Sequence, residues 1–404
     1  MKLVTVSNYI NHHQIPLSDA LDQALKQRED GSSYTFIQTE PMEEERRKMG
    51  WEASLKECTY LKFYYKEPEL CKTLINDADI VIFGGVEDES YIIERLKHNK
   101  IVIRSSERLY KEGTWKAISP RGLMKKYNDH TRYARSPVYL LCDGGYVASD
   151  FHIVRAYPDK MFRFGYFPRM KEYDITQLLH HKKEKGYLEL LWAGRMIDWK
   201  HPEMVVKLAR TLKEQKVQAH ITMIGDGPCR EELLREVKQA ELSEQVILKE
   251  FMPPEEIRKE MERADIYLFT SDYKEGWGAV LNEAMNSGCA VIASHAPGAT
   301  PYLIRDGENG LVFKSGNQTE FTELALRVIR DAHLRTSLAK QAYETIKNKW
   351  NANEAARRLL VQCDRIAMGQ PIDFEASGPM SKAPIIAQHR MYGHLKGDHH
   401  TWNS

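Results

Sequence analysis

The chain lacks long hydrophobic runs and paired cysteines, and these absences exclude several classes of protein. No stretch of its 404 residues approaches the 18 apolar residues of a transmembrane helix. The opening MKLVTVSNYI lacks the apolar length and the small-residue cleavage site of a signal peptide. The six cysteines form no C-x-x-C pair, which argues against a zinc site or disulfide framework and favours reduced thiols. We therefore expect a cytoplasmic protein.

The chain also lacks a strong charge imbalance. Its net charge of +1 gives no whole-molecule field that would favour nucleic acid or strong membrane attraction. The segment RGLMKKYNDHTRYAR (121–135) is locally basic and contains aromatic residues. It is either a solvated helix face or a surface for peripheral contact with anionic lipid at the inner face of a membrane.

Short apolar runs alternate with amphipathic segments along most of the sequence. Runs such as ADIVIFGG, YLELLWA, QAHITMIG, DIYLFTS and CAVIAS show little period-2 alternation, which is typical of strands buried on both faces. Strands that alternate with helices predict βαβ units and parallel sheets. The predicted fold class is therefore α/β, with two Rossmann-like domains whose parallel sheets face a central cleft.

The length of the chain and a polar stretch near its middle set the expected domains. A chain of 404 residues is too long for one hydrophobic core. We expect an N-terminal domain over 1–175 and a C-terminal domain over 176–365, with the charged stretch 171–186 as interdomain linker. The segment 366–404 is expected to be a tail that lies over the surface, stays mobile or crosses back to the N-terminal domain.

The segment SDYKEGWGAVLNEAMNSG (271–288) follows a predicted strand and places two carboxylates at its carboxyl end. Gly276 and Gly278 flank Trp277 and let the backbone approach a ligand closely. A helix is predicted to begin near Gly278, with Glu275 just before it and Glu283 about two turns into it. The two carboxylates can accept hydrogen bonds from sugar hydroxyls. Alternatively, they only stabilise the helix dipole or face solvent.

Two further loops carry charged or flexible residues at strand ends. In AGRMIDWK (193–200), Gly194 and Arg195 follow a strand and Lys200 comes five residues later. A guanidinium fork and an ammonium suit a diphosphate, although basic residues at strand ends are often simply solvated. In MIGDGPCREEL (223–233), a Gly-x-Gly-Pro turn joins a strand to a helix, which a turn role alone would also explain.

Five motifs occur together in order: Gly-Arg-x4-Lys, Gly-Asp-Gly-Pro, Glu-x7-Glu, the Pro297-Gly298 turn and Asp-Gly-x-Asn-Gly. In this order and spacing, residues 187–365 resemble the retaining family-4 glycosyltransferases of GT-B fold. The resemblance implies that the C-terminal domain binds a nucleoside diphosphate-sugar of UDP or GDP type, and that the N-terminal domain binds the acceptor. It also implies that no cofactor and no metal is needed, because cationic side chains neutralise the leaving diphosphate.

The same resemblance assigns roles to individual residues. Arg195 and Lys200 would hold the donor diphosphate, and Glu275 would bind the hydroxyls of the transferred sugar. Glu283 would bind the ribose of the nucleotide. The remaining implied donor-binding residues are Gly194, Asp226, Gly227, Phe251, Gly276, Trp277 and Gly278.

The first half of the chain resembles the family only loosely. The first strand is followed by SNYINHHQIP in place of a glycine-rich loop, so His12 and His13 are acceptor-side candidates or merely solvated loop residues. After KIVIRSS the chain offers Glu107 where many members carry a histidine. Gly84 either lines the cleft or serves a tight turn. No catalytic residue is therefore assigned in this half.

The resulting hypothesis is a retaining transferase that moves a hexose-type sugar to a glycan or lipid-linked acceptor, as in the biosynthesis of bacterial surface polysaccharides. One rival is an inverting transferase with a histidine base or a nucleotide-sugar epimerase on the same fold. Another is a catalytically silent subunit that scaffolds a partner enzyme. The sequence leaves open the base, the sugar, the acceptor, the linkage and the oligomeric state.

Overall fold

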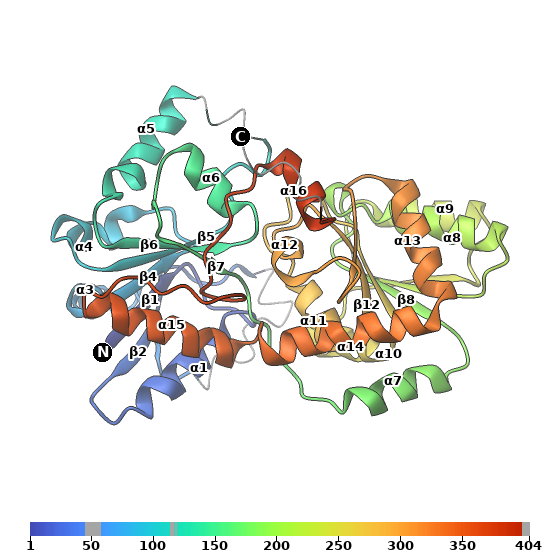
Figure 1. The fold of residues 1–404 in the computed structure, drawn as a ribbon, viewed down its shortest axis with the longest axis horizontal. Coiled ribbons are helices and arrows are strands. Elements are labelled where there is room, and N and C mark those ends of the chain that lie inside the picture. The colour runs from blue at the N-terminus through green and yellow to red at the C-terminus, as the bar shows by residue number, and fades with distance from the viewer. Residues whose placement is uncertain (45–57, 114–116, 118, 398–404) are drawn as a thin grey trace. The chain divides into compact units, whose positions relative to one another are not determined.

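The computed structural model describes residues 1–44, 58–113, 117 and 119–397, and the chain divides into two compact α/β units. Unit 1 comprises Met1–Arg169 and Lys349–Ile386, and unit 2 comprises Met170–Asn348 and the chain from Ala387 onward. Figure 1 shows the elements of each unit with their labels.

The sheet of unit 1 is parallel, with strand order β3-β2-β1-β4-β5-β6-β7. Its strands are β1 (Lys2–Ser7), β2 (Ser33–Gln38), β3 (Leu61–Phe63), β4 (Ile80–Gly84), β5 (Val102–Ser106), β6 (Val138–Asp143) and β7 (Met161–Phe164). Its helices are α1 (Ile15–Lys26), α3 (Pro68–Asp77), α4 (Ile93–Lys97), α5 (Pro120–Asp129), α6 (Val147–Ile153) and α15 (Ala352–Ala367), with 3-10 turns η2 (Glu89–Tyr91) and η4 (Thr131–Tyr133).

The sheet of unit 2 is also parallel, with strand order β10-β9-β8-β11-β12-β13. Its strands are β8 (Glu189–Ala193), β9 (His220–Ile224), β10 (Val246–Lys249), β11 (Ile266–Phe269), β12 (Ala290–Ser294) and β13 (Leu311–Phe313). Its helices are α7 (Ile175–Glu184), α8 (Glu203–Glu214), α9 (Arg230–Gln239), α10 (Pro254–Arg263), α11 (Val280–Asn286), α12 (Thr300–Leu303), α13 (Gln318–Arg330), α14 (Ala332–Asn348) and α16 (Gln388–Leu395), with the 3-10 turn η5 (Asp198–Lys200).

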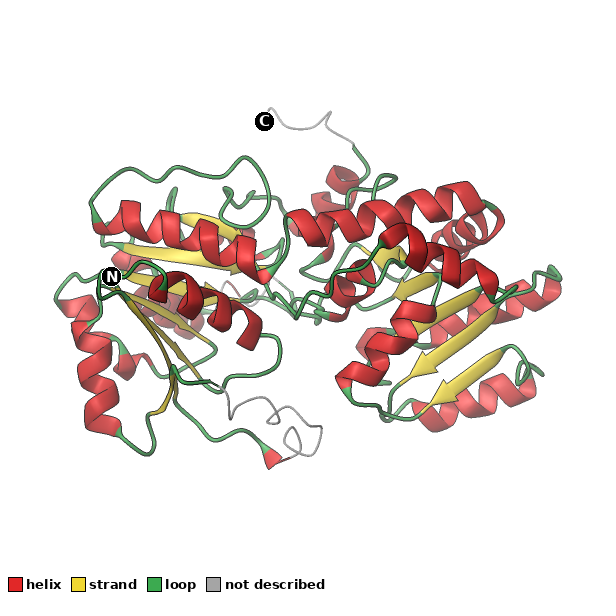
Figure 2. Cartoon of the chain, turned by 90° about the horizontal axis from the view of Figure 1, so that it is seen from below, coloured by secondary structure: helices red, strands yellow, loops and turns green. Residues whose placement is uncertain are grey.

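The apolar runs form these strands because helices cover the sheets (Figure 2). Every residue of β8, β11 and β12 is buried, and their side chains join one hydrophobic core with α8 and α13. The predicted α/β class with two Rossmann-like domains is therefore confirmed. Within the described ranges, no helix is long and apolar enough to cross a membrane.

In both sheets the strand order reverses beside the first strand of the unit. The neighbours are β1 and β4 in unit 1, and β8 and β11 in unit 2. Open parallel sheets bind ligands outside the carboxyl ends of the strands at such a switch point. The fold thus indicates one candidate ligand-binding site in each unit.

The expected linker over 171–186 is wrong, because most of it forms α7 of unit 2. Ile175 is buried, and Ile175, Leu178 and Leu179 contact the position of Gly288, whose added Cβ would lie 2.9 Å from Ile175. The next position in this stripe is a buried lysine, Lys182, which hid the apolar periodicity in the sequence. The chain passes between the units at Arg169 and Met170 instead.

The expected C-terminal boundaries also differ from the structure. Helix α15, expected to close the second domain, belongs to unit 1, where it packs against α1 and Arg28 forms an ion pair of 2.8 Å with Asp364. The segment expected as one tail divides between the units. Its first part, through Ile386, belongs to unit 1, with Met380 fully buried, and α16 belongs to unit 2.

Candidate functional site

The site at the switch point of unit 2 consists of residues 194–201, which follow β8, and residues 270–278, which follow β11. We call it the β8–β11 site. β8 and β11 are direct neighbours in the sheet, so their carboxyl ends bring the two loops together. The motifs Gly-Arg-x4-Lys and Glu-x7-Glu, which lie about 75 residues apart in sequence, meet at this edge.

Lys200 and Glu275 form an ion pair across the β8–β11 site. The ammonium of Lys200 donates to Oε2 of Glu275, and the hydroxyl of Ser271 donates to the same oxygen over 3.1 Å. The Lys200 and Glu275 side chains are only 12% and 14% exposed. This largely buried ion pair holds both side chains in place and leaves a small part of each accessible to a ligand.

Further contacts lock the two loops to each other. The Thr270 hydroxyl donates to the carbonyl of Lys200 over 2.6 Å, and the amide of Asp272 donates to the carbonyl of Trp199 over 2.9 Å. His201 lies 3.7 Å from Asp272 and 3.1 Å from Glu203. Hydrogen bonds to these carboxylates raise the pKa of His201 to about 9. The loops therefore form one pre-organised unit.

Arg195 is the second predicted cation, and it differs from Lys200 in its surroundings. Its side chain is exposed, with the guanidinium carbon 5.9 Å from the centroid of the Trp199 ring. The guanidinium of Arg195 makes no hydrogen bond or ion pair with another residue of the part that the structure describes. The exposed guanidinium of Arg195 can donate two parallel hydrogen bonds to an oxyanion, and the ammonium of Lys200 is held in place as a second cation.

The Gly-Asp-Gly turn after β9 packs directly on the loop after β8. A Cβ on Gly225 would lie 1.9 Å from the carbonyl oxygen of Gly194, and one on Gly227 would lie 2.5 Å from that of Met196. The amide of Met196 donates to the carbonyl of Asp226 over 2.8 Å. The glycines therefore serve close backbone packing, and they leave the Asp226 side chain exposed at the edge of the sheet.

Glu283 lies in the first turn of α11, not two turns into it, because the helix begins at Val280 and has seven residues. Burial raises the pKa of Glu283 to about 7, against the positive charge of Arg258, which lowers it. Its carboxylate makes no hydrogen bond with another described residue. The short helix offers little dipole, so binding of an anion here rests mainly on Arg195 and Lys200.

The side chain and the carbonyl of Trp277 are both used in the fold, and a donor contact through the backbone of Gly276–Gly278 stays a prediction. The indole is 1% exposed and donates to Asn282 over 2.8 Å, and the carbonyl accepts from the amide of Ala299. Trp277 is thus a core residue that shapes the loop. Gly278 is required beside it, since an added Cβ would lie 2.4 Å from the ring of Phe269.

The other predicted donor-side residues lie near the same edge. Gly276 is half-buried in the loop after β11, and Phe251 is 46% exposed just after β10. β10 is the outermost strand beyond β9, so Phe251 follows the strand next to the Asp226 turn. An exposed phenylalanine at this position offers a flat apolar face.

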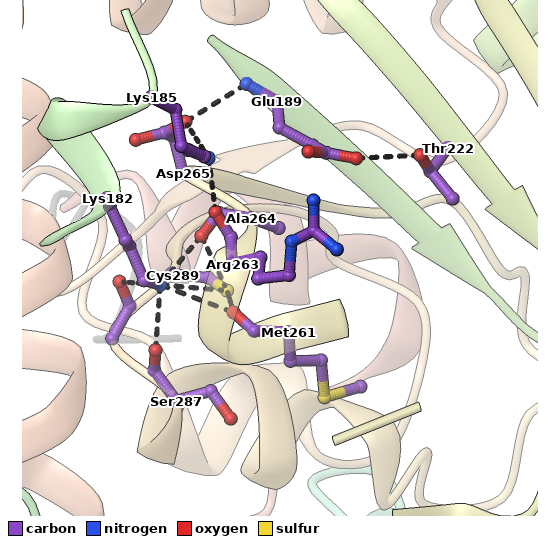
Figure 3. Close-up of polar contacts among 11 residues, drawn as sticks. Lys182, Lys185, Glu189, Thr222, Met261, Arg263, Ala264, Asp265, Ser287 and Cys289 are labelled. Carbon is purple, nitrogen blue, oxygen red and sulfur yellow. Dashed lines mark hydrogen bonds and ion pairs between the residues drawn. The ribbon is translucent and has the colours of Figure 1, made fainter. Parts of the chain in front are cut away.

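A buried lysine anchors α11, the helix that carries Glu283. Lys182 of α7 donates to the carbonyls of Met261 and Ala264 at the end of α10, over 3.2 and 2.6 Å, and to those of Ser287 and Gly288 after α11, both over 2.8 Å (Figure 3). The ammonium of Lys182 therefore lies at the C-terminal ends of α10 and α11, where the helix dipoles are negative. Burial lowers the pKa of Lys182.

Asp265, also shown in Figure 3, pins the amino ends of the central strands. Its carboxylate accepts from the amide of Glu189 over 3.0 Å and pairs with Lys185 over 3.1 Å. These polar groups at the amino ends of the strands therefore stabilise the fold. The β8–β11 site lies at the opposite, carboxyl ends of the strands.

Sequence reasoning missed a chain of aromatic and polar contacts beside the β8–β11 site. The Tyr273 hydroxyl lies 2.8 Å from Nε2 of His295, and Nδ1 of His295 accepts from the amide of Ser315 over 2.9 Å. The ring of Tyr392, on α16, packs edge-on against His295 with centroids 5.3 Å apart. These residues lie far apart in the sequence, and the polar sequence of α16 does not indicate that it packs here.

In unit 1, the structure links three of the predicted acceptor-side residues. His12 and His13 lie between β1 and α1, with ring centroids 3.8 Å apart. His13 stacks at 6.4 Å on Tyr166, whose hydroxyl donates to Glu107 over 2.7 Å. Tyr166 was not predicted, although it follows an apolar strand. Burial lowers the pKa of His12 to about 4 and that of His13 well below its usual value.

Gly84 and Asp143 end the two strands, β4 and β6, that flank β5 in unit 1. A Cβ on Gly84 would lie 2.5 Å from the carbonyl oxygen of Ser105, so this glycine serves strand packing. Asp143, also not predicted, accepts from the Ser105 hydroxyl over 2.5 Å. Burial raises the pKa of Asp143 to about 8, so this carboxyl is protonated near neutral pH.

Among the residues that the structure describes, no group of three or more His, Cys, Asp and Glu side chains is placed to hold a metal ion. All six cysteines are free, and four of them are buried. Arg195 and Lys200 place two cations in the β8–β11 site, and cations suit an anion better than a metal.

Comparison with known proteins identifies this part of the chain. Residues 177–345 match the model of the family described as Glycosyl transferases group 1. The amylovoran biosynthesis glycosyltransferase AmsK of Erwinia amylovora is 26% identical over 210 residues, 51% of this chain and 50% of that protein. The N-acetyl-alpha-D-glucosaminyl L-malate synthase of Bacillus anthracis is 27% identical over 194 residues, 47% of this chain and 48% of that protein. The match thus spans about half the length of these relatives.

Solved structures share the whole fold. HepE from Anabaena, solved in complex with UDP, superposes with a TM-score of 0.65 and 14% identity, covering 89% of this chain and 100% of that one. TarM superposes with a TM-score of 0.63 and 12% identity, covering 89% and 98%. These solved structures confirm the GT-B fold for both units.

Proposed function

We propose, from the glycosyl transferases group 1 domain at residues 177–345, that the protein is a retaining glycosyltransferase. It moves a sugar from a nucleoside diphosphate-sugar to a glycan or lipid-linked acceptor, on the cytoplasmic side of a membrane. The observation that carries the proposal is the Lys200–Glu275 ion pair at the switch point of unit 2, with the exposed Arg195 beside it.

Each part of the nucleotide-sugar donor is bound by side chains of matching chemistry. Arg195 and Lys200 hold the diphosphate, and their charges stabilise it as it leaves. Glu275 accepts hydrogen bonds from the hydroxyls of the transferred sugar, and Glu283 accepts those of the ribose. Asp226 with Gly227 borders the nucleotide. No metal is required, because the two cations balance the diphosphate charge.

The base of the nucleotide lies toward β10. Phe251 presents an exposed ring there, at the strand end beyond the Asp226 turn. A flat aromatic side chain suits stacking on a purine or pyrimidine. HepE was solved with UDP, so a UDP-sugar is the first donor to test.

The histidines of unit 1 argue against the rival inverting transferase with a histidine base. An inverting transferase needs a general base with a pKa near the working pH. His12, with a pKa near 4, is a weak base, and the pKa of His13 is also depressed. In the retaining reaction, the bond from the anomeric carbon to the diphosphate oxygen breaks, and the acceptor oxygen bonds to the same face. The acceptor proton passes to the departing diphosphate.

The acceptor is assigned to unit 1, at the carboxyl ends of its strands. Glu107, Tyr166 and the His12–His13 loop form a connected polar group there. A hydrogen-bonding group of this kind suits the hydroxyls of a sugar.

A donor panel with product analysis tests the proposal. Thermal shifts with UDP, GDP and ADP and with their glucose conjugates are expected to show one preferred base, since a ligand at 100 times its dissociation constant stabilises by about 2.7 kcal/mol. The Arg195→Ala variant should lose most of this shift. The anomeric configuration of the product, read by NMR, should equal that of the donor.

Each rival function has a distinct signature in the same experiment. An inverted product indicates the inverting transferase, and a changed donor sugar without acceptor indicates an epimerase. Binding of a donor with no turnover on any glycan or lipid-linked acceptor indicates a scaffolding subunit. No stabilisation by any nucleotide contradicts the proposal altogether.

A further inference from the structure

Helix α5 of unit 1 exposes an apolar surface that the transfer reaction does not use. None of its ten residues is buried, and Leu123, Met124 and Tyr127 are 43%, 62% and 53% exposed. Within the described ranges, no other helix or strand carries three exposed large hydrophobic residues. The helix lies at the periphery of unit 1 (Figure 1).

These three side chains lie on one side of the helix. At 3.6 residues per turn, Leu123, Met124 and Tyr127 fall within about 100° of its circumference. We call this surface the α5 face. Arg121 and Lys125 follow it around the helix, and both are exposed. Single exposed hydrophobic residues are normal on a protein surface, but a contiguous apolar face with a basic edge marks an interaction site.

The α5 face is not the face by which the helix packs on unit 1. That role belongs to its other side and its C-terminal end. Lys126 is half-buried there, and burial lowers its pKa. The ring of the following residue, His130, packs edge-on against Phe151 at 5.0 Å and lies 2.6 Å through Nδ1 from the Tyr157 hydroxyl. The helix is thus anchored with its apolar stripe turned outward.

The charge around α5 narrows the choice of partner. Residues 119–135 contain five basic residues and one acidic residue, a net charge of +4, whereas the whole chain has +1. The remaining 387 residues therefore carry −3, so the segment around α5 is more positive than the rest of the chain. An anionic partner is favoured, and its surface must also accept apolar side chains.

We propose that α5 docks the protein on an anionic lipid bilayer, with the α5 face in the headgroup region and the basic side chains on lipid phosphates. Leucine, methionine and a tyrosine ring on one side, with Lys and Arg beside them, are the composition of an interfacial helix. Nucleic acid would use the charges but not the apolar stripe. The inference deepens the proposed function by favouring a lipid-linked acceptor over a free glycan.

Vesicle sedimentation tests the docking directly on the full-length protein. The vesicles are made of phosphatidylcholine alone or with added anionic phosphatidylglycerol. The protein should sediment only with the anionic vesicles, and less at about 0.5 M than at about 0.1 M salt, because salt screens the phosphates. No sedimentation with anionic vesicles, or equal binding to both kinds, overturns the proposal.

Two variants separate the contribution of the apolar α5 face from that of the adjacent basic side chains. The triple variant Leu123→Ser, Met124→Ser, Tyr127→Ser removes the apolar contact, and the variant Arg121→Gln, Lys125→Gln removes charge. Each should weaken vesicle binding by about tenfold or more. The matched controls are Val361→Ser with Met368→Ser for exposed apolar residues and Lys207→Gln with Lys238→Gln for exposed lysines. The controls should bind like the wild type.

Thermal melting of each variant checks that it is folded. If the charge variant alone loses binding, the contact is purely electrostatic and the proposal is wrong. If the controls lose binding to the same extent, α5 is not the docking element. Because the assay contains no nucleotide and no acceptor, its failure leaves the donor experiments unaffected. Failure of the transferase proposal likewise leaves the vesicle result intact.

Discussion

Lys200 and Glu275 form an ion pair between the loops after β8 and β11, and each side chain is less than 15% exposed. The pair joins the two motifs proposed to bind the diphosphate and the transferred sugar. Removing one partner leaves the other charge poorly solvated, so the pair is expected to contribute to both stability and sugar transfer. Stability and activity can be measured separately.

The first prediction concerns this pair. Lys200→Met and Glu275→Gln should each abolish sugar transfer and lower the free energy of unfolding by about 1–3 kcal/mol. The double variant should recover most of the stability and none of the activity, because neither charge is then left unpaired. Urea unfolding and a transfer assay measure the two effects. Transfer by either single variant at the wild-type rate would remove the pair from the site.

The second prediction concerns the pKa of Glu283, which is raised to about 7. As a carboxylate it accepts hydroxyl hydrogen bonds, so affinity for the nucleotide-sugar should rise up to about tenfold between pH 6 and pH 8. Calorimetric titration with the donor chosen from the panel measures this. Glu283→Gln should flatten the pH dependence. A Gln variant with the wild-type slope would show that another group titrates.

The third prediction concerns His201, whose pKa of about 9 lies above its usual 6.5. A raised pKa means that the folded state holds the proton more tightly, so the stabilisation is fully present below pH 6.5 and is lost as pH rises through about 9. His201→Asn suits the left-handed backbone at this position, where φ is 50°, and cannot titrate.

Urea unfolding at about pH 6 and about pH 9.5 compares the two proteins. The wild type should lose on the order of 1–2 kcal/mol more than His201→Asn over this range, since partial exposure of the ring reduces the full effect. Equal losses would mean that the contacts of His201 with Glu203 and Asp272 contribute no pH-dependent stability.

The fourth prediction concerns Lys182. Lys182→Met keeps the length of the side chain but leaves four buried carbonyls without their donor, which should cost about 2–4 kcal/mol of unfolding free energy. Lys183→Met is the matched control, because Lys183 is exposed on the same helix. Thermal and urea unfolding compare them. Equal stability of both variants would show that Lys182 is not the anchor of α10 and α11.

Much of unit 2 could be predicted because its signals are local. Apolar strands and amphipathic helices repeat there, and a helix begins close to Gly278 as expected. Two strands of unit 1, β2 and β3, have weaker local signals. β3 has three residues, and β2 begins SYT, so neither presents a long apolar run.

The errors arose where distant residues decide the outcome. The sequence of α7 reads as a charged linker because Lys182 occupies a core position, and only the carbonyls of α10 and α11 make that position tolerable. The burial of the Trp277 ring was also not visible in the sequence, because it depends on a hydrogen bond to Asn282 and on the packing around it. Neither partner can be recognised before the chain is folded.

The sequence alone determined the fold class and the residue types of the donor motifs, because hydrophobic periodicity and motif spacing are properties of neighbouring residues. Only the tertiary structure decided that Lys200 pairs with Glu275, that Glu107 meets the histidine loop through Tyr166, and that α5 turns its apolar side outward. Those facts depend on which strands become neighbours and which helix faces find a partner. Sheet order and burial are set by the packing of the whole chain, so no local stretch encodes them.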